Sequence, residues 1–425
     1  MPATDFQGSS SSSSPFSSFG RSLLSLRRDA PASPAMPLSA AAAEEDAGLD
    51  AFQRHVAVLL ADLRGDGGGG AGDGFMSAAW IRRLLEAYVM CQEEFRVAAA
   101  AAAQARRRGG GVAQQQAERA VAELGERAVK ALDVCNAARD GVDQVRRWER
   151  LAGVAASALL AAAPGEVHEG HLRRARKALS DLAALLADEA AAAAGPGGAC
   201  GVAAFLASHR NRSFGRARAS PTRGSSSASS PTAHFRSLSW SVSRTWSAAR
   251  QLQAIGAGLA PPRAHEAAAG LAASAYAMGC LLHLAAWALV AAVPCPDRGA
   301  ALQAHHLPAQ PPRAAFHWAP PLLALQERLA EEGKRKDRRS SCGLLREIHA
   351  LEKSAQRLAE AIDAAPVPLA GDREAEVREA AAELAAVCAA MRDGLEPLER
   401  QLREVFHRIV RSRMEGLDSP ALNAG

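Results

Sequence analysis

Five arginines near the C-terminus are the residues whose type and spacing most directly suggest a binding function. A predicted helix there places the apolar residues Leu398, Leu402, Val405, Phe406 and Ile409 on one face. The opposing face carries Arg400, Arg403, Arg408, Arg411 and Arg413. A basic amphipathic helix of this kind either solvates its charges or presents them to an acidic partner. We therefore take these five arginines as candidate partner-binding residues.

A second basic region lies between Ala190 and His265, which contains nine arginines and no Asp or Glu. In it, Ser213 and Ser239 each follow an arginine by three residues, a spacing that basic-directed kinases accept. We take both serines as candidate phosphorylation sites, because a phosphate cancels about two positive charges. A solvated linker explains the same composition. No recognised nucleic-acid-binding module surrounds the region, so we expect no nucleic acid as a partner.

Other motifs resemble catalytic, metal or nucleotide sites but have the wrong spacing. The HEGH sequence at 168–171 lacks the four-residue step between the histidines of zinc proteases. His305, His306 and His317 have no carboxylate or Cys at ligand spacing. The glycine run at 65–74 lacks the Gly-Lys-Ser/Thr ending of a phosphate loop. We therefore expect no catalytic residue, cofactor or bound metal, and we do not expect an enzyme.

The seven cysteines are scattered, odd in number and without a CxxC pair. That usage fits reduced thiols in a cytosolic protein. Cys91, Cys135 and Cys388 fall on predicted helix faces, where a buried structural thiol is the expected role.

The segment from Ala267 to Val293 contains no charged residue and is the candidate membrane segment. As a helix it would be about 40 Å long, more than the hydrocarbon core of a bilayer. Twelve of its residues are Ala, however, and Tyr276, Cys280, His283 and Trp287 form a polar stripe that requires partners. We favour the central helix of a soluble bundle. The alternative is a single-pass membrane protein, which alkaline carbonate would leave in the pellet.

The fold expected from this pattern is all-α, an elongated multi-helix bundle of long helices. Apolar residues recur at helical spacing and no strand pattern is evident. Residues 48–194 and 236–419 are predicted to be the first and second helical parts of the bundle. A disordered Arg/Ser/Pro-rich linker at 195–235 separates them, and 420–425 forms a tail.

Residues 1–47 are expected to be a disordered tail with no apolar core of signal-peptide length. Within it, residues 16 to 28 can form a short basic amphipathic segment that touches an anionic membrane surface. The alternative is a tail whose apolar residues dock on the body of the protein.

Several long strings resemble the plant BYPASS-related family, and most closely its Roh-type proteins. They occur in order over nearly the whole chain. They include MCQEEFRV at 90–97, KALDVCNAARDGVDQVRRWERL at 130–151, HFRSLSWSVSRTWSAARQLQAI at 234–255, SCGLLREIHALEKSAQRL at 341–358 and LEPLERQLREVFHRIVRSRMEGLDS at 395–419.

The resemblance implies a noncatalytic adaptor that binds Exo-seventy-type subunits of the exocyst. Roh-type proteins are linked to polarised secretion and cell-wall polysaccharide deposition, which implies a cytoplasmic protein peripheral at the plasma membrane. Other family members are linked to developmental control of root-to-shoot signalling, which is the alternative function. The resemblance carries over no catalytic motif, and the oligomeric state stays open.

Overall fold

A computed structural model of the chain describes residues 38–65, 74–106, 112–194, 246–262, 270–302, 311–312, 315–335, 342–364 and 371–417. Several predicted features lie outside the described residues: Ser213, Ser239, the basic segment at 16–28, the linker at 195–235 and the tail at 420–425. The contacts divide the chain into Met1–Glu44 and Glu45–Gly425. The fold described below is that of Glu45–Gly425.

The prediction of an all-α protein is confirmed, since the described residues form helices and no strand. The helices are α2 (Leu38–Arg64), α3 (Ala78–Arg106), α4 (Val112–Leu160), α5 (Glu169–Ala194), α7 (Ala248–Gly256), α8 (Gly270–Ala292), α9 (Arg298–Ala301), α10 (Ala319–Lys334), α12 (Arg346–Ala364) and α13 (Gly371–Leu417).

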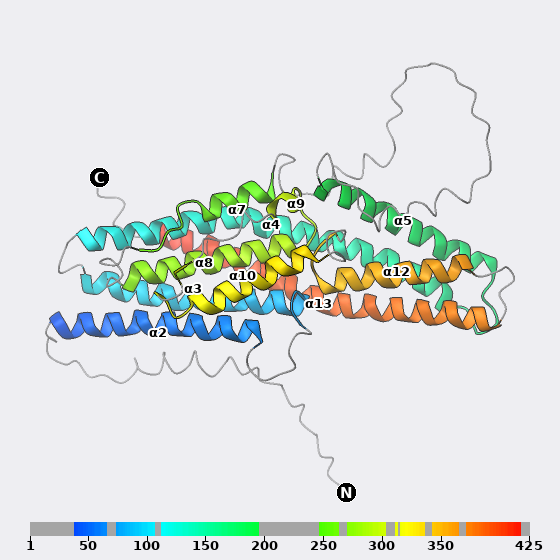
Figure 1. Cartoon of the computed structure of the whole chain (residues 1–425), viewed down its shortest axis with the longest axis horizontal. Coiled ribbons are helices and arrows are strands. Elements are labelled where there is room, and N and C mark those ends of the chain that lie inside the picture. The colour runs from blue at the N-terminus through cyan, green and yellow to red at the C-terminus, as the bar shows by residue number, and fades with distance from the viewer. Residues whose placement is uncertain are drawn as a thin grey trace, which may run out of the picture. The chain divides into compact units, whose positions relative to one another are not determined.

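Two long helices, α4 and α13, pack directly against each other and connect the rest of the bundle (Figure 1). With 49 and 47 residues, each is about 70 Å long. Helix α4 also contacts α5, α7 and α8, whereas α13 also contacts α12 and α3. The two predicted helical parts therefore meet along the α4–α13 contact and also where α4 packs on α7 and α8 and where α3 packs on α8 and α13.

The helix ends differ from the sequence-based expectation in two places. Helix α2 begins at Leu38, before the predicted start at residue 48. Within the predicted second helical part, 236–419, α10 ends at Lys334 and α12 begins at Arg346, and residues 336–341 between them lie outside the described part. Pro397 lies inside α13, which stays one helix through it.

Helix α8 is the core of the bundle and packs against α3, α4, α7 and α10. Among the described helices it alone is long and apolar enough to cross a membrane, and that whole apolar window is buried against its neighbours. Its small residues allow close contacts: a Cβ added at Gly279 would lie 2.7 Å from Leu259 Cδ1. Burial on all sides favours the bundle helix over the membrane span.

The polar residues of α8 are buried as predicted, but several of their polar atoms lack the expected hydrogen-bond partners among the described residues. Neither ring nitrogen of His283 has a hydrogen-bond partner among the described residues, and the same is true of Trp287 Nε1. The His283 ring instead lies against α7, where a Cβ added at Gly256 would be 2.5 Å from its Cε1. Because apolar helices surround it, burial lowers the pKa of His283 from 6.5 to about 4.

The C-terminal end of α8 is held by a segment distant in the sequence. Leu344 N donates to Ala291 O at 2.9 Å and Leu345 N to Ala292 O at 3.1 Å. These bonds satisfy carbonyls that a helix end leaves without intrahelical partners. On the other side, α4 reaches this end through Gly141, where an added Cβ would lie 2.5 Å from Pro294 O and 2.9 Å from Val293 Cγ2.

Replacement of Gly141 by Ala should lower the free energy of unfolding by about 1–3 kcal/mol, because the new methyl group meets the backbone of Pro294. Gly125→Ala is the matched control in the same helix, where an added Cβ meets nothing within 4 Å. That change should stabilise by about 0.5–1 kcal/mol. Urea denaturation followed by circular dichroism measures both values. Equal effects would contradict the close α4–α8 contact.

The buried His283 should make the protein less stable as the pH falls. The unfolded state takes up a proton below pH 6.5, whereas the folded state does so only near pH 4. Between these values the unfolded state binds more protons, so stability falls by about 1.4 kcal/mol per pH unit. Between pH 7 and pH 5, the free energy of unfolding of the His283→Leu variant should therefore fall by about 1–2 kcal/mol less than that of the wild type. Identical losses in urea denaturation would show that His283 is not buried in the neutral form.

Candidate partner-binding site

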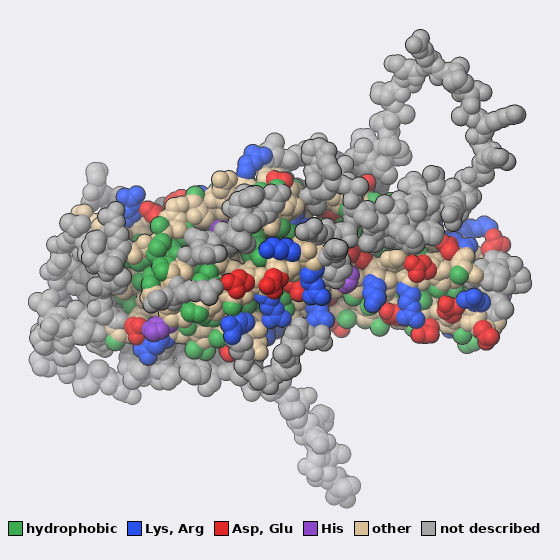
Figure 2. All heavy atoms as spheres, viewed as in Figure 1, with side chains coloured by type: hydrophobic (Ala, Val, Ile, Leu, Met, Phe, Trp, Pro, Cys, Tyr) green, Lys and Arg blue, Asp and Glu red, His purple; other side chains and the backbone are tan. Residues whose placement is uncertain are grey.

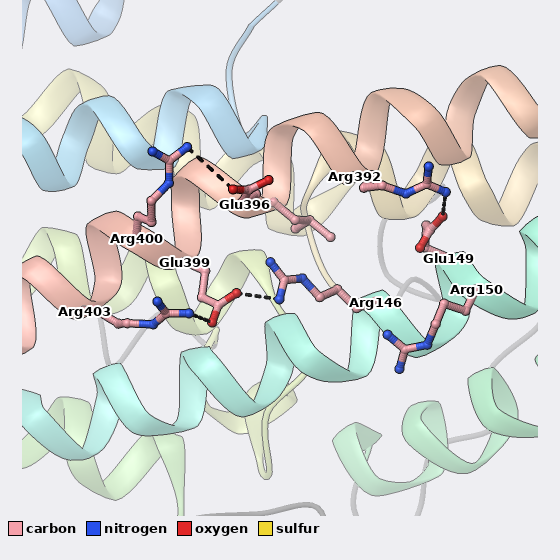
Figure 3. Close-up of a pocket in the computed structure, with 9 residues that line it drawn as sticks. Arg146, Glu149, Arg150, Arg392, Glu396, Glu399, Arg400 and Arg403 are labelled. Atoms are coloured by element: carbon pink, nitrogen blue, oxygen red, sulfur yellow. Dashed lines mark hydrogen bonds and ion pairs between the residues drawn. The ribbon is translucent and has the colours of Figure 1, made fainter.

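An open groove of about 570 Å³ lies between α4 and α13, and we call it the α4–α13 groove (Figure 3). Its lining residues are Arg146, Glu149, Arg150, Arg392, Leu395, Glu396, Glu399, Arg400 and Arg403. Five arginines face three glutamates, which leaves a formal excess of two positive charges. An excess of this sign favours an anionic ligand.

Helical spacing brings the charged groups to the groove from both helices. On α4, Arg146 and Arg150 are one turn apart and flank Glu149. On α13, Glu396, Glu399 and Arg403 follow the same three-and-four spacing. Residues three or four apart share a helix face. The apolar side of α13, with Leu395 and Leu398 fully buried, fixes which face turns towards α4.

Glu399 links the two helices. Its carboxylate accepts Arg146 of α4 at 2.5 Å and also Arg403 of α13 (Figure 3). The Glu399 side chain is only 11% exposed, so these ion pairs are better shielded from water than most surface pairs. Two of the groove arginines are therefore held in place by one carboxylate.

Glu149 also links α4 to α13 by an ion pair, at the other end of the groove. Its buried carboxylate accepts Arg392 at 2.5 Å, and this hydrogen bond raises the pKa of the Arg392 guanidinium. Two further arginines are less restrained. Arg400 lies 4.0 Å from the exposed Glu396, and exposed Arg150 makes no ion pair with a described residue.

Three of the predicted arginines lie outside this groove. Arg408 contacts Glu93 of α3 at 3.1 Å and Glu404 at 2.7 Å, and Arg413 contacts Glu126 of α4 at 2.8 Å. Arg411 is exposed and has no ion pair within the described part of the chain. Arg408 and Arg411 line a smaller pocket of about 80 Å³ against α3.

That pocket also carries more arginines than glutamates, with Arg96, Arg408 and Arg411 against Glu93 and Glu415. A hydrogen bond from Arg96 lowers the pKa of the Glu93 carboxyl, and the nearby Arg408 and Arg411 lower it further. On the face drawn in Figure 2, positive and negative side chains are interspersed. The α4–α13 groove is the larger of the two sites and has the larger formal excess, two positive charges against one.

The structure brings only part of the predicted basic face together. Arg400 and Arg403 share the groove, whereas Arg408, Arg411 and Arg413 turn towards α3 or the neighbouring part of α4. Sequence reasoning missed Arg146, Arg150 and Arg392. The one-turn spacing of Arg146 and Arg150 was a visible signal, but nothing in the sequence indicates that α4 faces α13.

The described residues contain no group of three His, Cys, Asp or Glu that could hold a metal ion. His168 and His171 of the HEGH sequence stack with their ring centroids 5.9 Å apart. The six described cysteines are all buried, which confirms the expectation for Cys91, Cys135 and Cys388. Burial raises the pKa of Cys135 to about 12 and that of Cys388 to about 11. Both thiols therefore stay protonated near neutral pH.

Comparison with known proteins gives a match over nearly the whole chain. The family described as "Protein ROH1-like" matches residues 10–420. This chain belongs to the ROH1-like family. It is similar to Protein ROH1D of Arabidopsis thaliana, with 40% identity over 434 aligned positions that cover all of both chains. It is also similar to Protein ROH1A of the same plant, with 34% identity over 88% of this chain and 90% of that protein.

No solved structure matches this ROH1-like chain. Family membership confirms the resemblance found in the sequence, that of a Roh-type plant protein. The names of these two relatives indicate no ligand or partner.

Removal of the Glu399 carboxylate should destabilise the protein, because Arg146 and Arg403 lose their shared partner. We expect Glu399→Ala to lower the free energy of unfolding by about 1–3 kcal/mol. Glu396→Ala, one turn earlier, is the matched control, since that side chain is 71% exposed and 4.0 Å from Arg400. Its effect should be below about 0.5 kcal/mol. Urea denaturation measures the free energy of unfolding of both variants. If Glu399→Ala lowers it no more than Glu396→Ala does, the ion pairs of Glu399 with Arg146 and Arg403 do not stabilise the fold.

Proposed function

We propose that this ROH1-like protein is a noncatalytic helical adaptor that binds Exo-seventy-type subunits of the exocyst. Through this contact it modulates polarised secretion and cell-wall polysaccharide deposition. The class of partner comes from the family resemblance. The observation that supports a binding role is the α4–α13 groove, where five arginines outnumber three glutamates on an accessible surface.

The contact we propose is built on α13. Its outer arginines form a series from Arg400 to Arg413, and the buried residues Leu398, Leu402 and Ile409 hold the same helix in the core. A helix fixed in this way presents its charges in a defined order. Partner recognition then costs little conformational entropy, because the backbone that carries the arginines is already ordered.

The same proposal places the protein in the cytoplasm, peripheral at the plasma membrane. The burial of α8 on all sides supports a bundle helix, because a lipid-facing helix would leave part of that surface uncovered. An anionic membrane surface is a further proposed contact, for which the sequence offers the basic segment at 16–28.

The purified full-length chain should capture a purified Exo-seventy-type subunit in a pull-down. Arg411→Glu combined with Arg413→Glu should reduce capture severalfold, because both side chains are exposed and their reversal opposes an acidic partner. Arg119→Glu with Arg173→Glu, on exposed positions of α4 and α5, changes the net charge equally and should have little effect. These variants leave the buried side of α13 intact.

Circular dichroism should show equal helicity for both double variants. No capture by the intact chain would contradict the exocyst proposal. The developmental signalling role of the wider BYPASS-related family would then replace it. Equal capture by both double variants would show that this end of α13 does not form the contact.

A further inference from the structure

We infer that the α4–α13 groove binds an extended, Asp/Glu-rich segment of the partner protein. The inference rests on the proposed function in one respect, namely that the chain binds a protein. It adds the chemical nature of the recognised segment and the residues that bind it. The groove binds this segment, and Arg411 and Arg413 outside it belong to the wider partner contact proposed above.

The first argument is the charge available in the groove. Glu149 and Glu399 are committed to Arg392, Arg146 and Arg403 by ion pairs. Exposed Arg150 has no ion pair with a described residue, and Arg400 lies 4.0 Å from its nearest carboxylate. The guanidinium group of Arg150 is thus available, and that of Arg400 is held only by a long ion pair with exposed Glu396.

The second argument is preorganisation. A guanidinium carries five N–H donors in a fixed fork, and an ion pair with one carboxylate uses at most two of them. Arg146, Arg392 and Arg403 are therefore held in position while some of their donors stay open to a ligand. Because the long side chains are already ordered, a bound carboxylate does not have to immobilise them.

The third argument is the distribution of charge along the groove. From Arg392 to Arg403, α13 spans about 16 Å. Figure 3 shows Arg400 beside Glu396 on α13, and Arg150 on α4 away from it across the groove. Charges placed apart in this way match several spaced carboxylates better than a single phosphate group, which could contact only one end.

The fourth argument concerns the backbone of the occupant. An extended chain rises about 3.3 Å per residue, so about five residues cover this length. Helices α4 and α13 pack directly against each other beneath the groove, with Leu395 at its floor. A helix of about 10 Å diameter is too wide to enter between them. We therefore expect a single extended segment with acidic side chains at alternate positions.

The test is fluorescence anisotropy with the full-length chain and three fluorescein-labelled peptides. The acidic probe is Glu-Ser-Glu-Ser-Glu-Ser, and the neutral probe has Gln in place of Glu. The third probe is the neutral peptide with one phosphoserine. The acidic probe should bind, the neutral probe should not, and higher salt should weaken binding. Stronger binding of the phosphoserine probe than of the acidic one would overturn the inference in favour of a phosphate ligand.

The groove variant is Arg150→Gln with Arg400→Gln, two exposed side chains whose replacement leaves the ion pairs of Glu149 and Glu399 in place. It should raise the Kd for the acidic probe about tenfold. Arg173→Gln with Lys177→Gln removes the same charge from exposed positions of α5 and should change the Kd by less than about twofold. Equal effects of the two double variants, or no binding of the acidic probe, would overturn the inference. Thermal unfolding of each variant confirms that it is folded.

A parallel pull-down separates this inference from the exocyst proposal. Groove-dependent binding of the acidic probe without capture of an Exo-seventy-type subunit would support the inference and contradict that partner. If the wild type and the groove variant capture the subunit equally, the exocyst proposal is supported, but the groove is not the site that binds the subunit.

Discussion

The contact between α4 and α13 is the interaction on which the rest of the bundle depends. Each helix is about 70 Å long, so neither can bury its apolar side against a single short neighbour. At successive positions, α4 covers α5, α8 and α7, while α13 covers α12 and α3. Trp148 on α4 and Leu395 on α13 are both fully buried. Loss of this contact would expose the interior of every helix pair attached to it.

The same contact organises the charges of the candidate site. Glu149 and Glu399 lie at the edge of the buried α4–α13 interface, where they are shielded from water and hold arginines of the opposite helix. Their Coulomb interactions are therefore stronger than those of the exposed i,i+4 pairs elsewhere on the helices. In the groove, positive charge is in excess, and three of the five arginines are held in position by buried carboxylates.

Helix α8 shows how composition and environment act together. Its many alanines contribute little transfer free energy to a bilayer. Glycines of neighbouring segments allow the close approach to it: Gly256 of α7 lies against the His283 ring, and Gly343 lies against the backbone of Ala292. The cost is that the two ring nitrogens of His283 are buried without partners among the described residues. Unpaired polar atoms in a core lower stability, and here they also make it depend on pH.

The fold class, the family and the positions of most helices follow from the sequence alone. The apolar residues of α4, α5, α8 and α13 recur with the helical period, and their spacing depends only on local geometry. The same local pattern placed Leu398, Leu402 and Ile409 inside and the arginines of α13 outside. It also indicated that the cysteines are structural, since helix faces decide their burial.

Only the tertiary structure decided which charges act together. Arg400 and Arg403 meet Arg146, Arg150 and Arg392 because α4 lies against one side of α13, whereas Arg408 and Arg411 face α3. Ion pairs between residues more than two hundred positions apart, such as that of Arg392 with Glu149, leave no trace in local periodicity. For the same reason, no described residue supplies the hydrogen-bond partner expected for His283. Helical spacing shows that a side chain is buried, but the packing of other helices decides what surrounds it.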